Sequence, residues 1–131
     1  MAKLTEAMKE MVANHQCYIA TVDENGYPNI GPKRSTRVLD DSTLMFVEGT
    51  GKQTYQNLLA NPKVAIAVAD RSVLDGYRFV GTAEVLHEGE LYERAAAMSA
   101  QAGMPKPKAV VKVHVEAIYS LKPGSAGERI D

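Results

Sequence analysis

The sequence has no tryptophan, two phenylalanines and one cysteine, Cys17. A single cysteine excludes an internal disulfide and a cluster of thiolate metal ligands, and it agrees with a reducing compartment. No apolar run approaches the roughly 20 residues that a membrane-spanning helix needs. The first residues carry an acid and polar groups where a signal peptide has an apolar stretch. We therefore expect a cytoplasmic protein with no membrane partner.

Neither sign of charge is in excess, because the chain has 15 basic and 16 acidic residues. Such a balance provides no global field that would attract nucleic acid, so we expect no nucleic-acid partner and only a local anion site. The three histidines lie far apart without ligand spacing, and we expect no metal site. Cys17 falls in an apolar stretch, where we interpret it as a small buried hydrophobic residue.

A chain of 131 residues with 45% hydrophobic residues suits one domain, 1–131. Apolar residues at helical spacing between Leu4 and Val12 predict an N-terminal helix within residues 1–13. Alternation and turn residues predict six strands, at 17–22, 27–39, 43–47, 63–70, 77–87 and 110–121. Two further short helices are expected after residues 51 and 90, and the turn-rich segment 122–131 is expected to be a mobile tail.

The order of these elements predicts the fold class. Hairpin-type turns join most of the strands, and helices do not alternate with them as in a parallel sheet. We therefore expect a mainly β protein with short α-helices, a six-stranded antiparallel barrel. Pro28 and Pro32 cannot donate to a strand ladder, so the predicted strand 27–39 should lie at an edge or at a break in pairing.

The first candidate site is a basic segment that concentrates three cations and two hydroxyl groups. If residues 27–39 form one strand, Lys33, Ser35 and Arg37 share a face. A solvated basic edge strand that discourages aggregation is the alternative interpretation. The segment consists of Pro32, Lys33, Arg34, Ser35, Thr36 and Arg37.

The second candidate site combines glycines with a lysine and a hydroxyl group at the start of a helix. Free backbone N–H groups and the positive end of the helix dipole suit an anion there, and glycine lets a ligand approach the backbone. An ordinary loop before a helix is the alternative. One strand separates the two segments, so the fold could bring them together around one phosphate. This segment consists of Gly49, Thr50, Gly51, Lys52, Gln53 and Thr54.

Most of the chain resembles one known family. Residues 17–23 with 25–28 resemble its opening hairpin, residues 33–39 its flavin-contacting strand, and residues 44–47, 52–54 and 57–65 its most recognisable stretch. The family is that of the pyridoxamine 5′-phosphate oxidase-like FMN-binding split barrels. The resemblance implies a split barrel that forms a homodimer with FMN at the subunit interface.

The resemblance also implies roles for the candidate residues. Lys52, Gln53 and Thr54 would hold the FMN phosphate, and residues 33–35 would contact the flavin ring or the ribityl chain. Arg37 would reach the phosphate or solvent. The sequence departs from the true pyridoxamine phosphate oxidases, because it has no tryptophan where their C-terminal substrate segment carries one. Oxidation of vitamin B6 is therefore not expected.

Three functions remain open from the sequence. The leading hypothesis is an FMN-dependent oxidoreductase acting on an unidentified small molecule, with flavin as the redox group and no catalytic side chain identified. The second is a non-catalytic FMN-binding electron carrier or flavin store. The third is a split barrel that binds haem, another cofactor or nothing.

Overall fold

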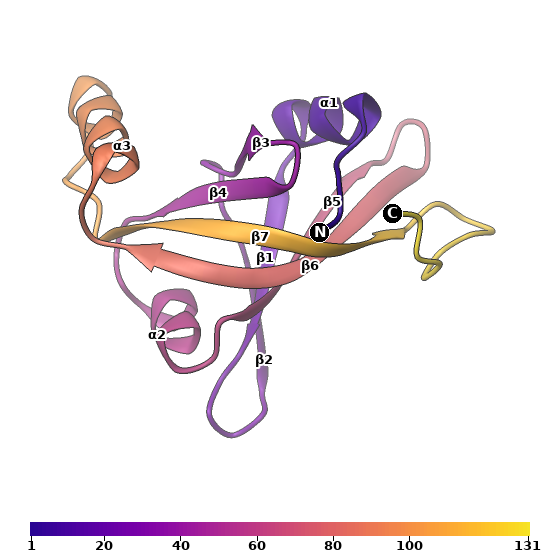
Figure 1. Ribbon diagram of the computed structural model, residues 1–131, viewed down its shortest axis with the longest axis horizontal. Helices are drawn as coiled ribbons and strands as arrows, with labels where there is room; N and C mark the ends of the chain where they lie inside the picture. The colour runs from indigo at the N-terminus through magenta and orange to yellow at the C-terminus, as the bar shows by residue number, and fades with distance from the viewer.

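The chain forms one antiparallel sheet with three short helices, and the computed structural model describes all residues, 1–131 (Figure 1). The elements in chain order are α1 (Glu6–Asn14), β1 (Cys17–Val22), β2 (Pro28–Pro32), β3 (Arg37–Asp40), β4 (Thr43–Glu48), α2 (Gln53–Ala60), β5 (Lys63–Asp70), β6 (Asp75–Leu86), α3 (Glu90–Gln101) and β7 (Ala109–Ser120). The mainly β class with short helices is confirmed. None of the helices is long and apolar enough to cross a membrane.

The two edge strands of this sheet are consecutive in the chain. The strand order is β2-β1-β5-β6-β7-β4-β3, so residues 33–36 connect one edge of the sheet directly to the other. Lys33 N donates to the Cys17 carbonyl oxygen at 3.1 Å on the β1 side, and Val47 N donates to Ser35 Oγ at 2.8 Å on the β4 side. The sheet therefore curls into a split barrel whose seam is spanned by this connection.

The number of strands differs from the prediction of six, because the predicted strand 27–39 is two strands. Pro32 ends β2, and both the backbone N–H and the hydroxyl group of Thr36 donate to the Lys33 carbonyl oxygen, which closes a turn. The edge position inferred from Pro28 and Pro32 is confirmed. The prediction that Lys33, Ser35 and Arg37 share a strand face was wrong, because residues 33–36 are not in a strand.

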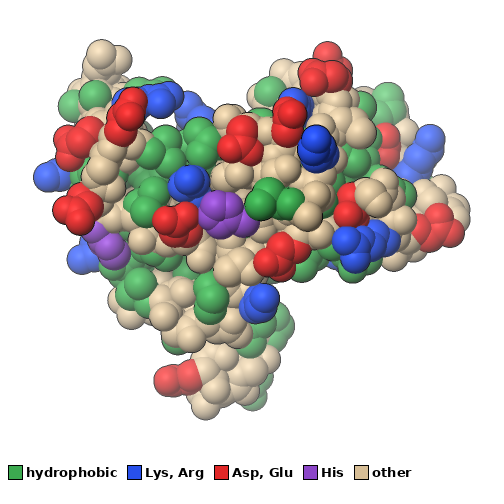
Figure 2. Space-filling model, in the orientation of Figure 1, with side chains coloured by type: hydrophobic (Ala, Val, Ile, Leu, Met, Phe, Trp, Pro, Cys, Tyr) green, Lys and Arg blue, Asp and Glu red, His purple; other side chains and the backbone are tan.

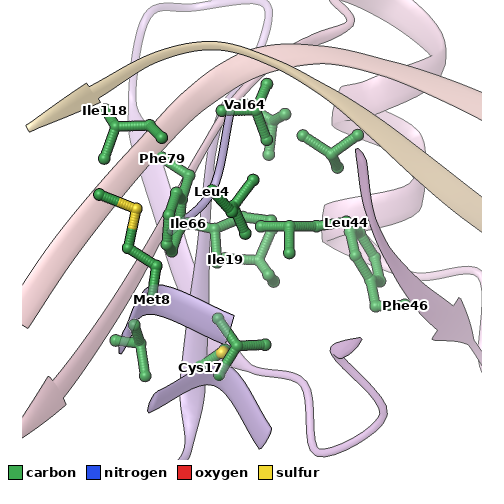
Figure 3. Packing of buried hydrophobic residues seen from close by; sticks show 14 of the residues in the cluster. Leu4, Met8, Cys17, Ile19, Leu44, Phe46, Val64, Ile66, Phe79 and Ile118 are labelled. Carbon is green, nitrogen blue, oxygen red and sulfur yellow. The ribbon is translucent and has the colours of Figure 1, made fainter. Parts of the chain in front are cut away.

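The main core lies inside the curled sheet (Figure 3), and the buried side chains of helix α1 are part of it. Ile19, Ile66, Phe46 and Phe79 are completely buried there. The alternation predicted for residues 63–70 is confirmed, since the valines and isoleucine of β5 point inward and its alanines are more exposed. Such burial of large apolar side chains contributes about 1.5–3 kcal/mol per residue before cavity terms.

A β-bulge in β7 changes which residues reach the core. Val80 lies opposite Ala117 while Gly81 lies opposite Val115, so Glu116 is an extra residue on β7. Beyond the bulge the pleat is reversed, so Ile118 is fully buried and Tyr119 only partly, whereas unbroken alternation along β7 would bury Tyr119. Glycine is required at position 81, because a Cβ atom there would lie 2.1 Å from the His114 carbonyl oxygen.

The segment 122–131, which was expected as a mobile tail, turns back along β7 in the structure. Ser120 N donates to the Glu128 carbonyl oxygen at 2.8 Å, and Ile130 N donates to the Ile118 carbonyl oxygen at 2.9 Å. Hydrogen bonds from the Arg129 guanidinium and from the Ile118 N–H lower the pKa of Asp131 to about 2. These contacts pair the segment with the end of β7.

Candidate functional site

The structure brings the two candidate segments together at the seam of the barrel. We call residues 32–37 the basic turn and residues 49–54 the glycine turn. Glu48, the last residue of β4, connects them: its Oε2 lies 2.9 Å from Lys33 Nζ, and its Oε1 accepts a hydrogen bond from Gly51 N at 3.3 Å. The proximity anticipated from the single intervening strand is therefore present.

The glycine turn leads into an uncapped helix start. Lys52 is the N-cap residue of α2, and no side chain caps the first-turn N–H groups. Gly51 has a φ of +70°, a conformation that favours glycine. Asn29 Nδ2, from β2, donates to Thr54 Oγ1 at 3.2 Å and so ties the helix start to the sheet edge. Uncapped N–H groups beside an exposed lysine suit an anionic ligand.

The predicted residues divide into structural and accessible ones. Ser35 and Thr36 have side chains engaged in the hydrogen bonds that form the seam, and Arg37 Nε donates to the Ser35 carbonyl oxygen at 3.2 Å. Gln53 Nε2 donates to Asn57 Oδ1 at 2.6 Å within α2. The remaining side chains that are exposed and have no such role are those of Pro32, Arg34, Thr50 and Lys52, with Gly49 exposed beside them.

Sequence reasoning missed one further cation at this place, Lys108. Lys108, just before β7, lies along Gly51, where an added Cβ would be 3.1 Å from Lys108 Cγ. Its Nζ lies 5.8 Å from the centre of the Tyr55 ring, and its N–H donates to the Glu48 carbonyl oxygen at 2.9 Å. No local motif could have identified Lys108, because its position depends on the pairing of β7 with β4.

Sequence reasoning also missed Glu48, although a signal for it existed. It is an acidic residue at the end of an otherwise apolar strand, directly before the glycine turn. Its side chain is only 2% exposed.

Figure 2 shows acidic and basic side chains interspersed on the face in view, so any preference for anions on this face must come from local cations.

Three further side chains with polar groups lie near the site: Tyr55, His87 and Cys17. The Tyr55 hydroxyl group lies 2.7 Å from His87 Nε2, which links α2 to the end of β6. Cys17 is buried, and burial raises the pKa of its thiol to about 11. The interpretation of Cys17 as a buried hydrophobic residue is confirmed, and burial disfavours its thiolate form.

A cavity of about 500 Å³ lies elsewhere on the surface and does not coincide with the candidate site. It is an open depression between the end of α1 and the ends of β1 and β5, lined in part by His15, Tyr18 and Asp70. His15 Nε2 lies 3.3 Å from Asp70 Oδ2, and hydrogen bonds from Ser72 lower the pKa of Asp70. None of the residues of the two turns lines this cavity. The candidate site is therefore defined by its cations and by the uncapped start of α2.

Fold and site together define a split-barrel protein with a cluster of cations and an uncapped helix start at the seam. The sequence profile of the pyridoxamine 5′-phosphate oxidase family matches residues 4–122, and the chain belongs to this family. HupZ of Group A Streptococcus is 48% identical, with a TM-score of 0.86 over 95% of this chain and 98% of that one.

Two further structures are similar. A putative pyridoxamine 5′-phosphate oxidase of Lactobacillus delbrueckii is 34% identical, with a TM-score of 0.79 over 89% of this chain and 93% of that one. An FMN-binding protein of Syntrophomonas wolfei shares the fold, with a TM-score of 0.76 at 22% identity over 89% of this chain and 85% of that one. The split-barrel fold expected from the sequence is confirmed.

Proposed function

We propose that this protein binds FMN at the interface of a homodimer in the cytoplasm and acts as a flavin-dependent oxidoreductase on a small molecule. The observation that carries the proposal is the uncapped start of α2. There the glycine turn, which contains Lys52, lies against Lys108 and beside the basic turn. Membership of the pyridoxamine 5′-phosphate oxidase family supports flavin as the ligand, as does an FMN-binding protein with the same fold.

The residues of the glycine turn fit a phosphate group. Lys52 and Lys108 supply positive charge, and the first-turn N–H groups of α2 supply hydrogen-bond donors that have no side-chain cap. Gly51 allows close approach to the backbone, because it has no side chain in the left-handed conformation. In this proposal Thr54 completes the phosphate contacts, while Gln53 holds Asn57 and contributes through its backbone N–H.

The basic turn fits the flavin ring and ribityl chain. Residues 33–36 lie outside both edge ladders, so part of their backbone is available to a ligand. Arg34 is exposed there, and Lys33 is partly exposed. Bound FMN would supply hydride or electron transfer, while these residues would bind and orient the ring and place positive charge beside it. Positive charge near the ring favours the anionic reduced flavin.

The exposed face of β2, β1 and β5 supports the homodimer. Ile30, Ala20 and Ala65 lie opposite one another across the three strands, and Tyr18 and Ala67 form the next row on the same face. Ile30 is 68% exposed and Tyr18 is 45% exposed in the single chain. A contiguous apolar surface of this kind marks an interaction site, and closed pairs are the commonest symmetric assembly.

The test is an absorption spectrum of the purified protein, followed by mass identification of the molecule released by heat. Flavin absorption and the mass of FMN would support the proposal. A haem spectrum, or a colourless protein that takes up no added FMN, would contradict it. Reoxidation of the reduced protein by candidate substrates then separates an oxidoreductase from an electron carrier or flavin store, since only the former shows turnover.

A further inference from the structure

Glu48 is a buried carboxylate whose hydrogen bonding is incomplete. Lys33 Nζ lies 2.9 Å from Glu48 Oε2 in an ion pair, and this oxygen has no further hydrogen-bond partner. The other oxygen accepts one long bond, of 3.3 Å, from Gly51 N. A buried charge is costly unless it is paired and fully hydrogen-bonded. The core alone therefore gives no reason for a carboxylate at this position.

The partners of Glu48 are groups that an anionic ligand would use. Lys33 belongs to the basic turn, and the Gly51 N–H belongs to the glycine turn. Neither turn contains an aspartate or a glutamate. Glu48 is thus the acidic residue that contacts both the basic turn and the glycine turn.

We propose that Glu48 is the internal counter-ion of this site and sets its preference for phosphate-bearing ligands. Its carboxylate neutralises Lys33 and accepts a hydrogen bond from the Gly51 N–H. One of the cations and one of the N–H donors of the two turns are therefore not free to bind a phosphate. The inference deepens the proposed function and rests on it for the identity of the ligand. Glu48 is a positioning residue, because it acts through Lys33 and Gly51 and touches no ligand itself.

Opposite effects of two single substitutions follow from this arrangement. Replacing Glu48 by glutamine keeps the size of the side chain but releases Lys33 as an uncompensated cation, which strengthens the attraction for phosphate. Replacing Lys33 by glutamine leaves Glu48 as an uncompensated anion, which weakens it. Replacing both residues removes a neutral pair and should restore the behaviour of the wild type.

The experiment compares the wild type with Glu48→Gln, Lys33→Gln and the double variant. Dissociation constants for FMN and riboflavin are measured by fluorescence titration, and their ratio isolates the phosphate. We expect the preference for FMN to rise about threefold to tenfold in Glu48→Gln and to fall by a similar factor in Lys33→Gln, as for one screened unit charge near a protein surface. In the double variant the ratio should return to within about twofold of the wild type.

Two controls keep the result specific. Glu10→Gln, on the exposed side of α1, makes the same change of net charge away from the site and should leave the ratio unchanged. Thermal unfolding identifies any variant that fails to fold. An unchanged ratio in both folded single variants, or a shift of both in the same direction, overturns the proposal.

Failure of the proposed function has a separate signature. If the wild type binds neither flavin, the proposal of a flavoprotein fails, and the four proteins are then titrated calorimetrically with inorganic pyrophosphate. Opposite shifts of pyrophosphate affinity in the two single variants still support Glu48 as the counter-ion. Equal affinities, or no pyrophosphate binding by any of the proteins, overturn it.

Discussion

Asn57 donates a hydrogen bond of 3.0 Å from Nδ2 to Thr21 Oγ1, and both side chains are buried. The bond joins α2 to β1 through the interior. On its other side Asn57 accepts a hydrogen bond from Gln53, in the first turn of the same helix. The start of α2, and with it the glycine turn, is therefore fixed to the sheet by a short chain of polar contacts.

The variant Thr21→Val removes the acceptor of this bond while keeping the shape of the side chain. The Asn57 Nδ2 donor is then buried without its acceptor, and we expect the free energy of unfolding to fall by about 1–3 kcal/mol. Denaturant titration measures the change. Thr50→Val, at an exposed position, serves as the control and should change stability by less than about 0.5 kcal/mol. If Thr21→Val is as stable as the wild type, the buried bond does not anchor the helix.

Lys52→Ala and Lys108→Ala should each weaken the binding of FMN more than that of riboflavin. The reason is that only FMN offers a phosphate with which an ammonium group can pair. We expect a loss of roughly tenfold in FMN affinity for each, about 1.4 kcal/mol, and little change for riboflavin. Lys106→Ala is the matched control, since this lysine lies near Tyr92 instead. Equal losses for both ligands would refute the assignment of these lysines to the phosphate.

Local patterns identified most of the elements but not the contacts between them. Strict alternation predicted β5 at residues 63–70, and the helical apolar spacing between Leu4 and Val12 predicted α1, because these signals lie within a few residues of one another. The break at Pro32 depends on a turn that Thr36 closes. Lys108 reaches Gly51 through strand pairing, and Ile118 reaches the core through a bulge opposite Gly81. Such features depend on long-range pairing, which single-sequence periodicity does not contain.

Gly81→Ala should destabilise the protein, because the new Cβ would overlap the His114 carbonyl oxygen, which belongs to rigid backbone. We expect a loss of about 3 kcal/mol in the free energy of unfolding, at the upper end of overpacking effects. Gly31→Ala is the control: an added Cβ at that position has no atom within 4 Å. A Gly81→Ala protein with the melting temperature of the wild type would show that the bulge relaxes easily.

The double variant Lys33→Gln and Arg34→Gln should lower the reduction potential of the bound flavin. In the wild type, the Lys33 and Arg34 cations favour the anionic reduced flavin. Each tenfold preference for that state corresponds to about 30 mV for a two-electron couple. Because Lys33→Gln leaves Glu48 as an uncompensated anion, we expect both substitutions to contribute to the shift, and each single variant to show part of it. Spectroelectrochemical titration at equal salt measures it, with Lys3→Gln, at an exposed position near Asp41, as the control. An unchanged potential would mean that the basic turn faces solvent.

Ile30→Glu should dissociate the homodimer and weaken flavin binding at the same time. Ile30 lies on β2 in the apolar row with Ala20 and Ala65, and the same strand leads directly into the basic turn. A carboxylate in that row would have to lose its water on association without gaining a partner, which is costly.

Sedimentation equilibrium at micromolar concentration, with FMN absorbance recorded in the same cell, measures both effects on Ile30→Glu. Met98→Glu is the matched control, because Met98 is also exposed but lies on α3, away from this face. We expect a dimer with bound flavin for the wild type and for Met98→Glu, and a folded monomer with weakened flavin binding for Ile30→Glu. A monomeric wild type that retains FMN would show that one subunit is sufficient for the site. A dimeric Ile30→Glu protein would place the interface on another face of the barrel.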